Sequence, residues 1–379
     1  MFTGGGFMDI GFEQAGFDVV WTNELNPVFA KMFMSARAGM SIPGAKRKPP
    51  KPNGISVADL KATQVLREAF KGKSPSMFGV IGGPPCPDFS RGGLNGGGNG
   101  INGKLTADFV QLLCRLQPDF FVIENVPGLL HTKKHRRFLN SQIAYLRKTG
   151  NFIVDFQILN ALQLGAPQDR ERLFIVGFRK LLVHRALGRR PRTTENGWFP
   201  WPVDPKYRDA RQLPWPKTSP FGKQPPKPSG IPDELMVYTY LGPHNDPAKV
   251  ANGLDVFKAH SRKFRTRREG DVKHKSFKRL HRYRFSPTAW YGNQEVHLHP
   301  WLPRRLSVRE ALRLQTVPDD YVLPADATLC AKFKLICNGV PCLMARAIAE
   351  RVREFAARSA ATKPHGSRRT SAKRTARTR

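Results

Sequence analysis

DFFVIENV, at residues 119–126, is the stretch that indicates the fold most directly. It is a run of large apolar residues that ends in Glu124 and Asn125, which is the pattern of a buried strand whose last residues reach a sheet edge. Similar apolar runs, separated by amphipathic stretches, are FDVVW (17–21), MFGVIGG (77–83) and RLFIVGF (172–178). This alternation is typical of βαβ units. It predicts an α/β fold for residues 1–179, with a Rossmann-like mixed, mostly parallel sheet and flanking helices.

The rest of the chain divides by composition. Residues 180–303 lack a long helical period and are rich in Pro, Trp and basic residues, which predicts a smaller, loop-rich domain. Helical spacing returns in LSVREALRLQ (306–315) and LMARAIAERVREF (343–355), so residues 304–357 are assigned to the first domain. The final stretch, 358–379, has eight Lys or Arg and no acid, and we expect it to be a disordered basic tail.

The charge balance is the strongest compositional signal. The 379 residues include 63 Lys and Arg against 29 Asp and Glu, a net charge of +34, and 40% are hydrophobic. The apolar content excludes a chain-wide disordered protein, and no run approaches the roughly 18 to 20 apolar residues of a membrane span. The cysteines fit neither a disulfide framework nor paired zinc ligands, which favours a reducing, cytoplasmic compartment; they stand at 86, 114, 330, 337 and 342. Nucleic acid is the expected partner.

A glycine-rich segment at the start of the chain is a candidate cofactor loop. FTGGGFMDIGFEQAGF (2–17) opens with three glycines, which would let backbone amides approach a ligand at a helix N-terminus. The following VVWTNE ends in Glu24, where an acid at a strand end could accept two ribose hydroxyls. A plain tight turn is the alternative for the glycines. Together with Glu24 they favour a nucleoside cofactor.

The candidate nucleophile is Cys86, in VIGGPPCPDFSRGG. A thiol on a proline-stiffened loop after a parallel strand stands where open α/β sheets place reactive groups. The alternative is a buried small-residue cysteine, although packing a thiol needs no such frame. Residues 91–103 contain seven glycines and three asparagines, and we interpret them as a closing lid, with a surface loop as the alternative.

Two further groups of polar residues accompany the apolar runs. Glu124 is either a turn acid or a functional carboxyl with a raised pKa at the sheet edge, and its position favours function. In GAPQDRERLFIVGF, Gln168, Arg170 and Arg172 alternate along the chain, so we expect all three on one face. An exposed charged strand is one reading of them, and an anion- or carbonyl-binding face is the one we favour.

Taken together, these segments resemble the cytosine carbon-5 DNA methyltransferases. FTGGGFMDIGFEQAGF is similar to the family's S-adenosylmethionine loop, NELNP to its ribose-binding acid, PPCP to its nucleophile, ENV to its base-contacting acid and QDRER to its paired arginines. RRLSVREALRLQTVPDDY and CNGVPCLMARAIAERV resemble its last two conserved blocks. The motifs occur in the family's order, which makes the resemblance specific.

The resemblance implies a site and a mechanism. Cys86 would add as a thiolate to carbon 6 of a flipped cytosine, and Glu124 would serve ring nitrogen 3 as a partly protonated acid. Arg170 would hold the base's carbonyl oxygen, with Arg172 as a supporting ion pair and Gln168 in the same block. S-adenosylmethionine would be the methyl donor, without a metal. Its site would comprise Phe2, Gly4, Gly6, Glu24, Asp59, Leu60, Asn338 and Val340.

The implied partner is double-stranded DNA. Residues 180–303 would form the target-recognition domain, in which 258–284 hold twelve Lys or Arg against two acids. A companion restriction endonuclease is a further implied partner, and we expect a monomer on DNA. Neither the target sequence nor the base that removes the carbon-5 proton is identified.

The chain departs from the family pattern at four points. Phe7 follows Gly4-Gly5-Gly6 where a further glycine is usual, Pro87 follows the nucleophile where glutamine is usual, and Cys337 precedes Asn338 where glycine is usual. The family's first strand precedes the glycine loop, whereas only Met1 stands before Phe2 here. We therefore expect either a natural reading frame that starts further upstream or weak donor binding.

Three alternatives remain open at the level of sequence. A transfer-RNA methyltransferase of the same chemistry usually carries Cys-Phe-Thr in the variable region, and that tripeptide is absent from this chain. A DNA-binding relative without activity would retain charge and fold, but Cys86, Glu124 and both arginines are intact. A nicotinamide-dependent oxidoreductase would leave Cys86, Glu124 and the charge unexplained.

Overall fold

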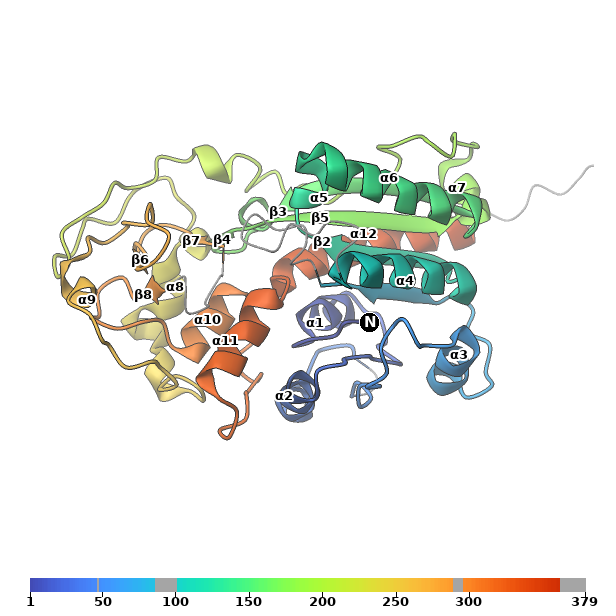
Figure 1. The fold of residues 1–379 in the computed structure, drawn as a ribbon. Coiled ribbons are helices and arrows are strands. Elements are labelled where there is room, and N and C mark those ends of the chain that lie inside the picture. Colours follow the sequence, from blue (N-terminus) through green and yellow to red (C-terminus); the bar gives the residue numbers. More distant parts are fainter. Residues whose placement is uncertain (46–47, 86–100, 289–295, 362–379) are drawn as a thin grey trace, which may run out of the picture.

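A central four-stranded sheet organises the molecule. The computed structural model describes residues 1–45, 48–85, 101–288 and 296–361. The strands are β1 (Gly79–Gly82), β2 (Phe120–Asn125), β3 (Phe152–Asn160) and β5 (Glu171–Arg179), in the order β1-β2-β5-β3 (Figure 1). β1 and β2 are parallel, and β5 is antiparallel to both β2 and β3. Three strands therefore run the same way, which confirms the predicted mixed, mostly parallel sheet.

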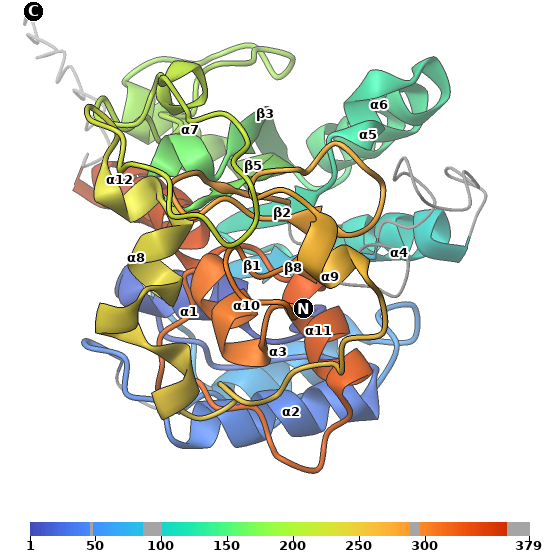
Figure 2. The ribbon, with the colours of Figure 1, turned by 90° about the vertical axis from the view of Figure 1, so that its left-hand side faces the viewer.

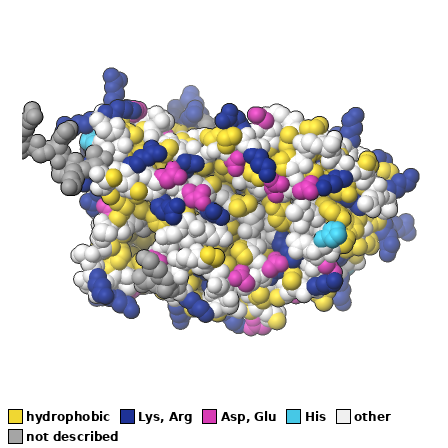
Figure 3. All heavy atoms as spheres, turned by 180° about the vertical axis from the view of Figure 1, so that it is seen from behind, with side chains coloured by type: hydrophobic (Ala, Val, Ile, Leu, Met, Phe, Trp, Pro, Cys, Tyr) yellow, Lys and Arg dark blue, Asp and Glu magenta, His cyan; other side chains and the backbone are white. Residues whose placement is uncertain are grey.

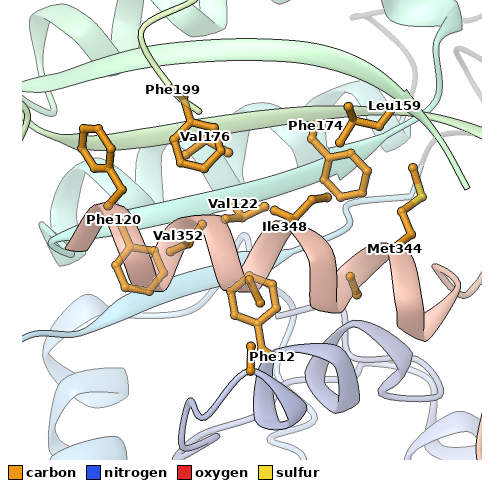
Figure 4. Packing of buried hydrophobic residues seen from close by; sticks show 14 of the residues in the cluster. Phe12, Phe120, Val122, Leu159, Phe174, Val176, Phe199, Met344, Ile348 and Val352 are labelled. Carbon is orange, nitrogen blue, oxygen red and sulfur yellow. The ribbon is translucent and has the colours of Figure 1, made fainter. Parts of the chain in front are cut away.

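Helices cover both faces of this sheet. Phe120 and Val122 of β2 point to one face, where they pack with Val176 of β5 and with Ile348 and Val352 of α12 (Figure 4). Their alternate neighbours Phe121 and Ile123 point to the other face, in the cluster that includes residues of α4 and α6. A strand covered on both sides needs apolar residues at every position, which is why β2 is continuously hydrophobic until Glu124. The helices of the sheet region are α1 (Phe7–Gln14), α2 (Pro27–Ala38), α3 (Ala62–Phe70), α4 (Ile101–Leu116), α5 (Gly128–His131), α6 (Lys133–Lys148) and α7 (Lys180–Leu187).

The predicted strand at 17–21 does not form. Residues 17–21 are partly exposed and have no strand assignment, and nearby only Asn23 makes an isolated bridge, to Asn53. In the described part of the chain no neighbouring strand offers a ladder to this segment, and Trp21 is instead held by its indole N–H, which donates to Glu68. The N-terminal ammonium of Met1 contacts the edge of β1, where it donates to the Ile81 carbonyl at 2.7 Å. Conversely, β3 was not among the predicted strands.

The later part of the chain has few regular elements before α10. It includes α8 (Val237–Leu241) and α9 (Lys263–Thr266), and two pairs of very short parallel strands: β4 (Gln168–Asp169) with β7 (Ser286–Pro287), and β6 (Lys278–Arg279) with β8 (His297–Leu298). The elements α8 to α11 lie together on the side of the molecule shown in Figure 2. Trp198 and Phe199 pack in the same cluster as the sheet and α12. The domain boundaries remain proposals, and this packing favours a first boundary after residue 199 rather than at 180.

The predicted C-terminal helices are present. They are α10 (Val308–Leu314), α11 (Leu329–Asn338) and α12 (Cys342–Ala361). The expected start of the tail at 358 is wrong, because α12 continues to Ala361 and the buried Ser359 hydroxyl donates to the Leu182 carbonyl at 3.0 Å. The rest of the expected tail, 362–379, lies outside the described residues. In the described ranges, no helix is both long and apolar enough to cross a membrane.

Candidate active site

Glu124 and Arg172 form an ion pair where β2 and β5 meet the sheet edge. The Arg172 Nε lies 2.8 Å from the Glu124 Oε1, and both side chains are 12% exposed. The pair is set by the register, because Asn125 of β2 lies opposite Leu173 of β5 and Arg172 comes next along that strand. The predicted carboxyl at this edge is therefore accompanied by a cation, and both side chains keep a small exposed fraction.

Gly83 brings the end of β1 against the same carboxyl. A Cβ at this position would lie 2.9 Å from the Glu124 Oε2, a distance that side chains essentially never adopt. A side chain at this position would therefore displace the carboxyl end of Glu124. Pro84 and Pro85 follow, and Cys86 comes three positions after Gly83. Cys86 lies outside the described residues, as do residues 91–100 of the expected lid.

The environment of Glu124 favours its protonated form. Burial raises the pKa of the Glu124 carboxyl, and the charges of Arg172 and Arg170 together with the Arg172 hydrogen bond oppose that rise. Because burial is the largest cause, the pKa remains above the ordinary value for glutamate. The carboxyl can therefore hold a proton at a pH where an exposed glutamate would have lost it.

Arg170 is buried more deeply than Arg172. Its side chain is 0% exposed, and its Nη2 donates to the carbonyls of Cys337 and Gly339, both at 2.9 Å. Gln168 is also buried, and its Nε2 donates to the Leu314 carbonyl at 3.1 Å. The strand is interrupted at Arg170, which belongs to neither β4 nor β5. The charge of Arg170 still acts on the Glu124 carboxyl, and a shared anion- or carbonyl-binding face stays a prediction.

The glycine-rich segment forms a tight turn beside Glu24. Gly4 has φ 54°, its N–H donates to the Glu24 Oε2 at 2.8 Å, and a Cβ there would meet nothing within 4 Å. Gly6, at φ 73°, would place a Cβ 2.5 Å from the Phe33 ring. Phe2 is partly exposed, and its ring packs edge-on against Phe109. The expected turn and the expected acid therefore lie together, with open space in front of Gly4.

The segment 337–340 closes against this turn through Phe7. A Cβ on Gly339 would lie 2.1 Å from the Phe7 ring, and that ring is 2% exposed. The Tyr321 hydroxyl donates to the Gly5 carbonyl at 2.8 Å and its ring packs on Phe7. Phe7 therefore fills the space between the two segments instead of crowding the turn.

Of the remaining expected donor-site residues, some face solvent and others pack in the core. Asp59 is exposed and Asn338 is exposed at the end of α11. Leu60 is 2% exposed in the cluster against which Phe2 packs, and Val340 is 4% exposed in the sheet cluster. The structure brings the turn, Glu24 and the 337–340 segment together. The space at Gly4 and the partly exposed Glu24 fit a nucleoside with ribose hydroxyls.

Sequence reasoning overlooked two residues that hold this arrangement. The Gln315 Nε2 donates to the Ile336 carbonyl at 2.8 Å, and the Cys342 N–H donates to the Gln315 carbonyl at 3.0 Å. The second residue is Tyr321, whose hydroxyl anchors Gly5. Both residues lie within the RRLSVREALRLQTVPDDY block, so the signal was present, but a single sequence does not distinguish a buried amide or hydroxyl from an exposed one.

Comparison with known proteins agrees with this architecture. A putative DNA modification methyltransferase encoded within an Escherichia coli prophage has a TM-score of 0.59 at 24% identity, with 93% of this chain and 97% of that chain covered. Spodoptera frugiperda DNMT2 has a TM-score of 0.55 at 14% identity, with 94% and 97% covered. At these identities the structures support the fold alone.

Sequence relatives extend the match. The chain is 41% identical to the Type II methyltransferase M.NmeDI of Neisseria meningitidis serogroup C, over 93% of this chain and 82% of that protein. It is 28% identical to the Type II methyltransferase M.FnuDI of Fusobacterium nucleatum, over 93% of both. The family model for C-5 cytosine-specific DNA methylase matches residues 1–354. The chain therefore belongs to the C-5 cytosine-specific DNA methylase family and is a DNA cytosine-5-methyltransferase.

Proposed function

We propose that this enzyme methylates carbon 5 of a flipped cytosine in a specific double-stranded DNA sequence through a covalent adduct with Cys86. The observation that carries the proposal is the Glu124–Arg172 pair, packed against Gly83 three positions before Cys86. Addition to carbon 6 of cytosine requires three groups: a thiol, an acid and a cation. S-adenosylmethionine would supply the methyl group when bound beside Gly4 and Glu24.

The chemistry assigns one role to each group. The Cys86 thiolate adds to carbon 6, and the electron pair released from the 5,6 double bond moves toward ring nitrogen 3, which takes a proton from Glu124. The resulting enamine would attack the donor methyl through carbon 5 and displace a neutral thioether, and the proton on ring nitrogen 3 would return to Glu124. Removal of the carbon-5 proton then re-forms the double bond and expels the Cys86 thiolate.

We assign the base's carbonyl oxygen to Arg172 rather than to Arg170, and the exposure of the two side chains supports this choice. The Arg172 guanidinium is 12% exposed beside Glu124, whereas Arg170 is 0% exposed and donates to two backbone carbonyls. Arg172 can therefore orient the cytosine while it holds the carboxyl in place. Arg170 is a positioning residue, which links the QDRER segment to the 337–339 segment of the donor site.

The charge of the chain supports DNA as the partner. Lys and Arg side chains are spread over the face seen from behind, with Asp and Glu among them (Figure 3), and the net charge is +34. The target base lies inside the duplex, so it must leave the stack to reach Glu124. The relatives are named Type II methyltransferases, and we therefore include a companion restriction endonuclease in the proposal, with the enzyme acting as a cytoplasmic monomer.

Trapping of the adduct tests the proposal. In a duplex whose target cytosine carries fluorine at carbon 5, the fluorine cannot leave as a proton does, so the enzyme should remain covalently attached after methyl transfer. A denaturing gel should show a band of enzyme plus DNA with the parent and none with Cys86→Ser. Methyl transfer to ordinary DNA without any such band from the fluorinated duplex would overturn the covalent step.

A further inference from the structure

A basic surface on α6 has no role in the proposed chemistry. Residues 131–149 contain six Lys or Arg and no Asp or Glu. Four of these cations are exposed and lie within the first five residues of α6, and we call them the α6 cation cluster: Lys133, Lys134, Arg136 and Arg137. The opposite side of the helix carries its buried residues, which are His135, Leu139, Ile143 and Leu146. The helix therefore docks by its apolar side and presents the cluster to solvent.

The cluster opposes the stability of the free protein. The first turn of a helix carries partial positive charge and favours acids, but α6 has none there. In the described ranges none of the four cations forms an ion pair with a carboxylate. On α12, by contrast, Arg346 pairs with Glu350 at 2.8 Å and Arg351 with Glu354 at 2.8 Å. Unpaired cations also stand singly elsewhere on the described surface, but here four are gathered at the helix end that repels them. This concentration of charge is what favours an external polyanion.

The cluster is fixed close to the catalytic carboxyl. Lys133 comes nine positions after Glu124, because β2 leads through the short helix α5 directly into α6. The Thr132 hydroxyl accepts the His135 N–H at 3.2 Å, and the His135 Nδ1 lies 3.3 Å from the Gly128 carbonyl oxygen. These contacts hold the first turn of α6 against α5, at the end of α6 that faces the region of β4 and α8 to α10 (Figure 1).

We propose that the α6 cation cluster binds phosphates of the DNA duplex that flank the target cytosine, on the side of the catalytic domain. The inference rests on the proposed function, since it takes the duplex at Glu124 as given. Lysine offers a point charge to phosphate oxygens, and arginine offers two parallel N–H donors. Contacts of either kind with the DNA backbone carry no direct information about the base sequence. The cluster should therefore add affinity for any sequence and leave both the recognised sequence and the chemical step unchanged.

Two matched variants test this surface. In one, all four cations of the cluster are replaced by glutamine: K133Q, K134Q, R136Q and R137Q. The control removes the same charge from exposed residues near α3, α7 and the C-terminal half of α12: K73Q, R190Q, R192Q and R353Q. Affinity is measured at several salt concentrations for two 40-bp duplexes: one contains a single copy of the sequence that the enzyme methylates, and the other lacks it. The single-turnover rate is measured at saturating DNA.

The cluster variant should bind both duplexes at least tenfold more weakly than the control variant. Its plot of log affinity against log salt should be shallower by up to about 3.6, at roughly 0.9 for each phosphate that the cluster neutralises. The single-turnover rate should stay within about twofold of the parent. Equal affinities and slopes in the two variants would overturn the inference, while a parent that transfers no methyl to DNA cytosine would overturn the proposed function itself.

Discussion

At the scale of single residues, the proposed role of Glu124 as proton donor predicts how the rate should fall with pH. Burial raises the pKa of this carboxyl, so its acid form persists to higher pH than in an exposed glutamate, and the rate should fall as pH rises through that raised pKa. Ionisation of the Cys86 thiol acts in the opposite sense and should give the rising limb. The single-turnover rate should therefore be bell-shaped in pH.

Glu124→Gln should remove the falling limb of that profile. It should also lower the single-turnover rate by a factor on the order of 10² to 10⁴, because the thiolate remains while proton transfer to ring nitrogen 3 is lost. Rapid-quench measurements across pH check both effects. A variant that keeps the parental rate, or keeps the falling limb, would show that another group supplies the proton.

Gly83 offers a sharper test of the geometry around the same carboxyl. A Cβ there would lie 2.9 Å from the Glu124 Oε2, so Gly83→Ala should displace the carboxyl and slow methyl transfer by tenfold or more. Gly39→Ala is the matched control, because a Cβ at Gly39 meets nothing within 4 Å and its φ of −89° suits any residue. Equal single-turnover rates in the two variants would contradict the close approach of β1 to Glu124.

At the scale of elements, Arg170 joins two segments that are far apart in the sequence. Arg170→Met would remove this donor from the carbonyls of Cys337 and Gly339, although the Gly339 carbonyl keeps the Gln315 Nε2 at 3.4 Å. The cost should be at most about 1–3 kcal/mol for a group left unpaired. The melting temperature should fall, and the Michaelis constant for the donor should rise more than the turnover number falls. Calorimetry and steady-state kinetics measure these effects, with Arg190→Met as an exposed control. An unchanged donor constant would leave Arg170 with a purely structural role.

The elements also show what a single sequence can predict. β2 and β5 were predicted because continuous apolar runs of that length are buried on both faces of a sheet. The prediction of a strand at 17–21 was wrong, because a strand forms only where a neighbouring strand can pair with it, and a local sequence pattern does not report such a neighbour. The Trp21 indole N–H donates a hydrogen bond to Glu68 instead. Glu124 lies at the end of a strand, as its pattern predicts. Glu24 was expected at the end of a strand that does not form, and a hydrogen bond from the Gly4 N–H holds it beside the glycine turn instead. The bonds of Arg170 to the Cys337 and Gly339 carbonyls could not be predicted, because an alternating pattern does not report which backbone groups a buried side chain will meet.

At the scale of the whole molecule, we predict that sequence recognition and sequence-independent affinity belong to different parts of the chain. Residues 362–379 contribute seven Lys or Arg and no acid. Their deletion should weaken binding to every duplex alike and flatten the salt dependence by up to about 6, at roughly 0.9 for each phosphate that the tail neutralises. The methylated sequence should stay the same when plasmid DNA from expressing cells is sequenced. A changed methylation pattern would mean that the tail reads bases.

The most direct test of the central claim is the identity of the methylated base. The purified enzyme is incubated with methyl-labelled S-adenosylmethionine in two separate reactions, one with duplex DNA and one with transfer RNA. The nucleic acid from each reaction is then digested to nucleosides. We predict label in 5-methyldeoxycytidine from the DNA with the parent enzyme, and none with Cys86→Ser. Label confined to the RNA, label on another base, or equal label with Cys86→Ser would contradict a cytosine-5 DNA methyltransferase that acts through Cys86.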